Sequence, residues 1–182
     1  INFLAVYPTA PVNLNRNRSR EVLDHFLGTD ILQATPRTML DFGEEEQNPT
    51  YNNPKCTPCH YVMDPIAGTF QNWPRIQVQG IYDPSNPNAQ TRWEDTDAET
   101  VLQSPGLDRT TPLPAEDKDA GVQWLARQIV NDPRFGVATA DTLFEGLTGR
   151  QALTEPQPDQ SNYAYSAQIW QFQRAWLDSL GE

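Results

Sequence analysis

The sequence is poor in the side chains that bind metals and form disulfides. Its 182 residues include two cysteines, two histidines and two methionines. A structural zinc site takes four ligands, usually cysteine and histidine, so a zinc-based fold would have to use this entire supply of thiols and imidazoles. Any metal or cofactor bound through thiol, imidazole or thioether groups must therefore use some of these six residues.

Basic residues and long apolar runs are also scarce. Lysine and arginine number 13 against 24 aspartates and glutamates, which gives a formal net charge of −11. This balance argues against binding to nucleic acid or to anionic membrane surfaces, and it favours either solubility alone, the simpler interpretation, or a partner with a basic surface. No run of about 18 apolar residues occurs, so we expect no membrane span. Hydrophobic residues make up 37% of the chain and 16 residues are proline, which predicts long loops.

One short motif stands out against this background. The residues from Cys56 to His60 read C-T-P-C-H, a pattern typical of c-type haem attachment. Two thiols at this spacing can each add to one of the two vinyl groups on the same edge of a porphyrin. The histidine after the second thiol then lies beneath the ring, where its imidazole can bind the iron. We therefore expect one covalent haem c held by Cys56 and Cys59, with His60 as the proximal iron ligand.

Three other interpretations of the two cysteines remain open. A thioredoxin-type redox pair needs a βαβ context, and this neighbourhood shows none. A zinc site needs four ligands, and His60 is too close to Cys59 to share an ordinary tetrahedral site with both thiols. A disulfide across so short a loop would remove little entropy from the unfolded chain. The residues therefore favour the haem hypothesis.

The second axial position of the iron decides the chemistry, and the sequence offers few candidates for it. Met63 follows His60 on the same expected helix, hence on the same side of the haem. No methionine or histidine follows Met63, so an internal ligand must come from upstream. We favour Met39, whose tether to Cys56 is long enough to pass around the ring. His25 and an open position are the alternatives.

Hydrophobic periodicity predicts a mainly α-helical protein with long loops and little β structure. Helices are expected at residues 18–27, 56–63, 120–130, 133–148 and 162–180, and a short strand around Ile76 and Val78. Asp64-Pro65 should end the second helix, because the residue before a proline avoids the α region. Residues 110–114 resemble a linker, which divides the chain into a haem-binding domain, residues 1–110, and a small helical domain, residues 111–182.

Helix-capping residues support two of these helices. Gly28 suits a left-handed cap at the end of the first helix. Asp132 followed by Pro133 is a typical helix start, with aspartate as the N-cap and proline at the first helical position. Gly149 should stop that helix. In the last helix, an apolar face is expected to pack against neighbouring helices; its residues are Ile169, Phe172, Trp176 and Leu180.

The region around the motif resembles a known family. From Cys56 the sequence reads C-x-x-C-H-x-x-M-D-P-I-x-G-x-F-x-N, which resembles the haem segment C-x-x-C-H-x-x-[MI]-D-P-x-G-F-x-L-E-N-F-D of planctomycete-type cytochrome c proteins. Leu27-Gly28-Thr29 resembles the lead segment of that family, and residues 131–150 resemble its helical module. The sequences differ after Asn72, where Trp73 stands in place of Phe-Asp. The resemblance implies a domain of a large secreted protein whose C-terminal module has no assigned function.

These patterns lead to a functional hypothesis. We expect an extracytoplasmic monohaem cytochrome c domain, periplasmic or extracellular, that transfers single electrons and acts as a carrier more than as a catalyst. Because the chain begins at Ile1 with no visible leader, we expect a processed or truncated product. Four residues are expected to line the haem pocket: Tyr61, Ile66, Phe70 and Trp73.

Two alternatives stay open beside the electron carrier. An open iron position would allow peroxidase-like or small-ligand-binding activity, although no distal His-Arg pair is visible for acid–base catalysis. A non-catalytic docking module, bound to other subunits of a larger secreted assembly, is the second. The expected partner is thus either a redox protein with a basic surface or such an assembly.

Overall fold

The structure is a computed structural model that describes residues 2–7, 15–31, 53–54, 56–73, 82–83, 105–108 and 110–181. Within these residues the protein is mainly helical and contains no strand, as expected of a mainly α protein. The elements are α1 (Asn2–Val6), α2 (Arg16–Leu27), α4 (Thr57–Thr69), the 3-10 helix η2 (Ala115–Ala120), α5 (Gly121–Asn131), α6 (Pro133–Thr148) and α7 (Tyr163–Gly181). The strand expected around Ile76 and Val78 lies outside the described residues, and so does Met39.

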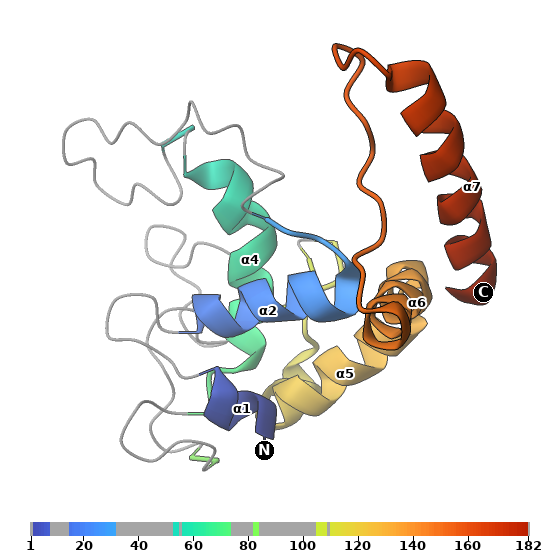
Figure 1. Ribbon diagram of the computed structural model, residues 1–182. Helices are drawn as coiled ribbons and strands as arrows, with labels where there is room; N and C mark the ends of the chain where they lie inside the picture. Colours follow the sequence, from blue (N-terminus) through green and yellow to red (C-terminus); the bar gives the residue numbers. More distant parts are fainter. Residues whose placement is uncertain are drawn as a thin grey trace.

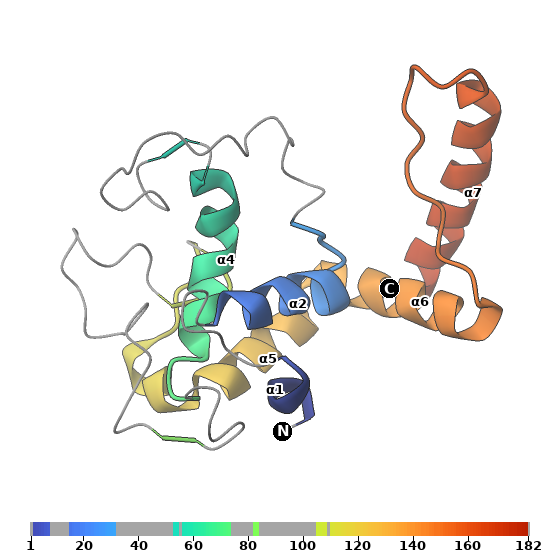
Figure 2. The same ribbon diagram turned by 60° about the vertical axis from the view of Figure 1, so that its left-hand side comes forward.

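The body of the molecule is built on the crossing of α2 and α4 (Figure 1). α5 packs on α4, and α6 packs on α2. In Figure 2, α6 leads away from this body, and α7 packs on α6 as an arm that stands apart from the body. The hydrophobic core consists of Leu4, Val22, Leu23, Leu27, Ile31, Ile66, Phe70, Leu107, Leu113, Trp124, Leu125 and Ile129.

The helix ends follow the capping chemistry expected from the sequence. Gly28 adopts a left-handed conformation with φ 59°, and its N–H donates to the Asp24 carbonyl at 3.2 Å. The Asp132 carboxylate accepts the backbone N–H of Arg134 at 2.9 Å and so caps α6. Gly149, with φ 67°, ends the same helix. These caps satisfy backbone groups that a helix end otherwise leaves unpaired, and the three predictions are confirmed.

The prediction that Asp64-Pro65 ends the second helix is wrong. α4 runs on to Thr69 with Pro65 in its interior. A proline inside a helix removes one hydrogen bond and costs about 3 kcal/mol. Burial of Ile66 and Phe70 in the core offsets this cost, since each large apolar side chain contributes roughly 1.5–3 kcal/mol. The Pro65 carbonyl also accepts a hydrogen bond from outside the helix, from the Gly106 N–H at 2.9 Å.

The segment read as a linker is a part-buried turn that packs on α4. Asp108 Oδ1 accepts the backbone N–H groups of Thr110 and Thr111 at 2.8 and 2.7 Å. Leu113 is fully buried, and its N–H donates to the Pro105 carbonyl at 2.6 Å. The predicted domain boundary after residue 110 falls within this turn, and residues on both sides of it contribute to one core.

The apolar face of α7 is largely exposed, contrary to expectation. Of the residues in this helix, Leu177 is buried, whereas Ile169, Phe172, Trp176 and Leu180 are 41%, 80%, 48% and 59% exposed. Phe144 of α6 meets the Trp176 ring edge-on, with centroids 6.1 Å apart. The periodicity thus predicted the helix correctly but not how much of its apolar face is covered by the described part of the chain.

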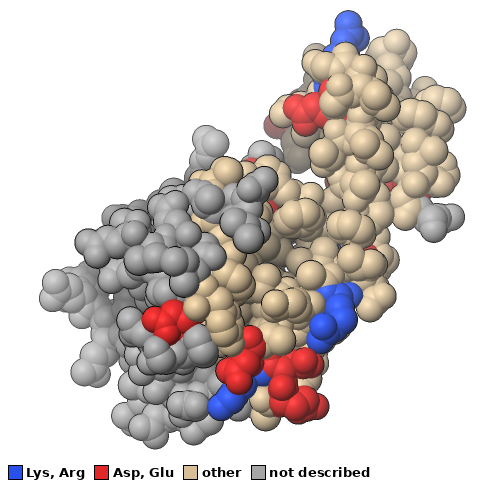
Figure 3. Space-filling model, turned by 90° about the horizontal axis from the view of Figure 1, so that it is seen from below, with Lys and Arg blue, Asp and Glu red and all other residues tan. Residues whose placement is uncertain are grey.

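The surface of the described residues carries mixed charge. Figure 3 shows acidic and basic side chains close together on one face of the body. As an example, Asp117 of η2 pairs with Arg127 of α5 at 3.3 Å. No described helix has both the length and the hydropathy that a membrane crossing requires, as the sequence led us to expect.

Candidate haem-attachment site

The C-x-x-C-H motif forms the first turn of α4. Cys56 stands at the N-cap position, and Cys59 and His60 follow within the helix. The turn is tied back to Asn53, whose carbonyl accepts the N–H groups of Cys56 and Thr57, both at 2.9 Å. Residues three and four apart lie on the same face of a helix. Both thiols and the imidazole are therefore presented on one side of α4, as attachment of a single porphyrin requires.

The His60 ring is anchored through one of its two nitrogens. Its Nδ1 lies 3.0 Å from Oδ1 of Asp64, one turn further along α4. Asp64 is in turn held by Arg16 of α2, whose Nε and one terminal nitrogen donate to the two carboxylate oxygens at 2.8 and 3.1 Å. The side chains of His60, Asp64 and Arg16 are 17%, 1% and 14% exposed. The three groups form a largely buried relay that links α2 to the motif.

Asp64 is ionised in this environment. Burial raises the pKa of its carboxyl, but the hydrogen bonds donated by His60 and Arg16, together with the Arg16 charge, outweigh burial and leave the pKa below its ordinary value. An ionised carboxylate can only accept hydrogen bonds, so Nδ1 of His60 carries a proton. Nε2 is then the ring nitrogen that can bind a metal.

This arrangement fits a haem iron. Histidines that bind metals nearly always donate their other ring N–H to a carboxylate or carbonyl, which fixes the ring and raises its basicity. Asp64 provides that acceptor for His60, and Cys56 and Cys59 stand on the same face of the helix. The donor set of α4 therefore has the composition and the spacing that covalent haem attachment needs.

The described residues give little support to a disulfide or a zinc site at the two cysteines. Within that part of the chain the two sulfur atoms are not bonded to each other. A group of three His, Cys, Asp or Glu ligand atoms within 4.8 Å of one another occurs there at Glu21, Asp24 and His25, not at the motif. A tetrahedral zinc site at the two thiols would need such convergence.

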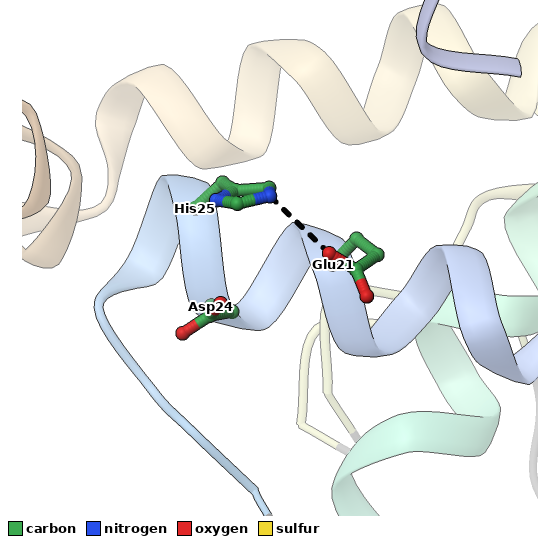
Figure 4. Close-up of side chains that lie close together, drawn as sticks. All are labelled: Glu21, Asp24 and His25. Atoms are coloured by element: carbon green, nitrogen blue, oxygen red, sulfur yellow. Dashed lines mark ion pairs between the residues drawn. The ribbon is translucent and has the colours of Figure 1, made fainter. Parts of the chain in front are cut away.

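His25, an alternative axial ligand, is engaged elsewhere. Figure 4 shows it beside Glu21 on α2, and its Nε2 lies 3.2 Å from the Glu21 carboxylate and 2.9 Å from the Tyr7 hydroxyl. His25 belongs to the C-terminal half of α2, whereas Arg16, which reaches Asp64, begins that helix. The structure thus does not bring His25 to the relay at His60.

The four residues expected to line a haem pocket are spread along α4 and beyond it. Tyr61 lies beside the motif and is 43% exposed, whereas Ile66 is fully buried in the core. Phe70 follows His60 by about 15 Å along the helix axis. Phe70 and Trp73 line an apolar groove of about 510 Å³ together with residues of α1, α2 and α5. The structure places this groove away from the thiols.

The sequence did not reveal that Asp64 holds His60 or that Arg16 holds Asp64. Asp64 carried a usable signal, because a carboxylate four residues after a histidine lies on the same helix face. Arg16 carried none, since it is distant in sequence and is brought to Asp64 only when α2 packs on α4.

Comparisons with protein-family models, with curated proteins and with solved structures give no match for this chain. The resemblance of residues 56–72 to the planctomycete-type haem segment therefore stays a prediction, and the function is argued from the geometry of the site.

Proposed function

We propose that this chain is a monohaem c-type cytochrome domain that transfers single electrons outside the cytoplasm. The observation that carries the proposal is the first turn of α4, where two thiols share a face with a histidine anchored through Nδ1. Cys56 and Cys59 would hold the haem by thioether bonds, and Nε2 of His60 would bind its iron. Bound haem supplies a metal that accepts and returns one electron.

The residues of the chain have defined parts in this proposal. Each thiol would add its S–H across a vinyl double bond, so attachment would need neither an oxidant nor a reductant. Asp64 keeps the proton on Nδ1 and the ring fixed. The 17% exposure of the His60 side chain limits the access of water to the imidazole.

The test begins with the full chain exported in a host that attaches haem c. We expect an intact mass that exceeds the polypeptide by one haem and a reversible change of absorption between the oxidised and reduced protein. Replacing both cysteines, Cys56→Ser with Cys59→Ser, should abolish the covalent haem. A colourless wild-type chain with the mass of the bare polypeptide would contradict the proposal and leave the docking module as the remaining function.

The two methionines separate the proposed axial ligand from its neighbour in sequence. We propose Met39 as the ligand opposite His60, which predicts a weak far-red band from sulfur bound to iron(III). Met39→Ala should abolish that band, and Met63→Leu should leave it, because Met63 lies on the proximal helix. Persistence of the band in Met39→Ala would make the assignment wrong.

A second function is favoured by the Asp64–His60 contact. A carboxylate behind the proximal imidazole strengthens it as a donor to iron, and strong proximal donation stabilises iron(III) and assists cleavage of a bound peroxide. If the position opposite His60 is open, the chain would bind small ligands or act on peroxide. A high-spin spectrum with rapid binding of carbon monoxide would support this function, and a low-spin spectrum with the far-red band would exclude it.

A further inference from the structure

We propose that Asp64 is a positioning residue which, clamped by Arg16, sets how strongly His60 donates to the haem iron. This role rests on the proposed function, because it needs iron on Nε2 of His60. It goes beyond that function in assigning the control of the redox potential to an ion pair between two helices.

The geometry explains why Asp64 can hold the ring. A histidine side chain turns about two bonds, and a fixed acceptor at Nδ1 removes both freedoms. Asp64 is such an acceptor, because Arg16 binds both carboxylate oxygens of Asp64 and the Asp64 side chain is 1% exposed. The acceptor is thus held from α2, a different helix from the one that carries His60, and the packing of α2 on α4 fixes the imidazole.

The same geometry makes Arg16 and Asp64 act in opposite directions. Oδ1 of Asp64 accepts from both Nδ1 of His60, at 3.0 Å, and Nε of Arg16, at 2.8 Å. A charged hydrogen bond to one oxygen lowers the electron density that this oxygen offers to its other donor. Arg16 therefore weakens the pull of Asp64 on the Nδ1 proton. Loss of Asp64 charge should reduce the basicity of the imidazole, and loss of Arg16 should increase it.

The consequence for the iron follows from its two oxidation states. A more basic imidazole stabilises iron(III) over iron(II) and makes the midpoint potential more negative. Asp64→Asn should shift the potential to more positive values, and Arg16→Gln should shift it to more negative values. If Asp64 and Arg16 only held α2 and α4 together, both variants would loosen this helix crossing, and the midpoint potential would shift in the same direction in both.

The experiment measures the midpoint potential of the haem-loaded full chain and the iron–histidine stretching band of its iron(II) form on the Met39→Ala background, where the iron is five-coordinate and the band can be observed. The vibration is needed because a change of charge alone would also move the potential, whereas the band reports the bond between iron and Nε2. We expect a lower frequency in Asp64→Asn and a higher one in Arg16→Gln. Matched controls are Asp141→Asn and Arg174→Gln, which remove the same charges from an ion pair at 3.0 Å between α6 and α7. Both controls should leave potential and band unchanged.

The outcomes separate this inference from the proposed function. A colourless wild-type chain would overturn both. Haem-loaded variants whose bands do not move, or whose potentials shift in the same direction, would overturn the positioning role and leave the cytochrome proposal standing. If Asp64→Asn does not fold, Arg16→Gln decides alone, because Arg16 begins its helix and the hydrogen bond between Asp64 and His60 lies within α4. A higher frequency of the iron–histidine band in Arg16→Gln supports the positioning role of Asp64, and an unchanged frequency contradicts it.

Discussion

Arg18 is a fully buried charge at the junction of three helices. Its side chain is 0% exposed. The guanidinium donates to the carbonyls of Tyr7, Trp73 and Leu4 at 3.0, 3.1 and 3.3 Å and to the Asn15 side chain at 3.2 Å. Burial lowers its pKa to about 10, which leaves it charged at neutral pH. One side chain thus ties the residues around α1, the start of α2 and the end of α4 together.

Replacing Arg18 should therefore cost much more stability than replacing a surface arginine. Arg18→Met keeps the length of the side chain but leaves several carbonyls without their donor, and we expect a loss of roughly 2–4 kcal/mol. Urea denaturation of the full chain measures it. Arg127→Met is the control, because Arg127 is 57% exposed and such surface changes stay within about 0.5 kcal/mol. Equal losses in both variants would contradict the role of Arg18.

At this scale the sequence was informative where chemistry is local. Cys56, Cys59 and His60 could be proposed as haem-attaching residues from spacing alone, because the chemistry of haem attachment would dictate that spacing. Arg18 and Arg16 could not, since nothing in an Asn/Arg-rich stretch distinguishes an arginine that will be buried from one that stays in water. Their roles depend on carbonyls and a carboxylate that are far away in the sequence.

Among the elements, α6 owes its start to Asp132. The pKa of this carboxyl is lowered, mainly by the hydrogen bond from the Arg134 side chain, with burial opposing and the Arg134 backbone N–H assisting. Asp132→Ala should cost about 1 kcal/mol, as N-cap losses do. A carboxyl with a lowered folded pKa contributes stability above its unfolded pKa of about 3.9 and loses it as the pH falls further.

The acid range therefore tests the cap. The difference in unfolding free energy between wild type and Asp132→Ala should be constant near neutral pH and shrink below about pH 4. Asp132→Asn can still cap the helix but cannot titrate, so it should retain most of the stability and lose the pH dependence. A difference that persists unchanged into strong acid would show that the charge of Asp132 contributes nothing.

Two glycines in helices predict opposite results for the same substitution. A Cβ on Gly121 would lie 2.6 Å from the Thr69 carbonyl oxygen, where α5 meets the end of α4, whereas a Cβ on Gly146 would meet nothing within 4 Å. Gly121→Ala should destabilise by roughly 1–3 kcal/mol. Gly146→Ala should stabilise by about 0.5–1 kcal/mol, because alanine loses less entropy than glycine in a helix. Thermal unfolding of both variants measures the contrast.

The elements also show where sequence reasoning fails. Ends marked by glycine or by Asp-Pro at a helix start were predicted correctly, because a cap is a local arrangement of a few backbone groups. Pro65 was misread, because its local cost was offset by burial against α2 and α5, which the sequence does not display. The preference of proline against a helix interior is worth about 3 kcal/mol. Burial of the surrounding segment can outweigh this preference, and residues 64–70 are all buried.

For the whole molecule, the distribution of the core separates α7 from the rest. The core joins residues of α1, α2, α4, the turn at residues 105–113 and α5, and no residue of α7 belongs to it. α7 is held instead by Leu177, by Trp176 against Phe144 and by Arg174, which pairs with Asp141 at 3.0 Å. Periodicity predicted three C-terminal helices but not that the last would pack mainly on α6, because a stripe of apolar residues does not show which element covers it.

This arrangement predicts that α7 opens without unfolding the body. Elements with few buried apolar contacts open locally at lower free energy than the core. We therefore expect α7 amides to exchange with solvent at least about tenfold faster than those of α2 and α4. This ratio corresponds to an opening free energy that is about 1.4 kcal/mol lower. Native-state hydrogen exchange measures this difference at several protein concentrations.

Two variants within α7 test the cause. Leu177→Ala should make the α7 amides exchange faster still, because burial of Leu177 anchors the helix. Phe172→Ser should leave their exchange unchanged, because Phe172 is 80% exposed. Protection of α7 equal to that of α4 at the lowest concentration would refute local opening. Protection that rises with concentration would mean that a second copy covers the exposed face.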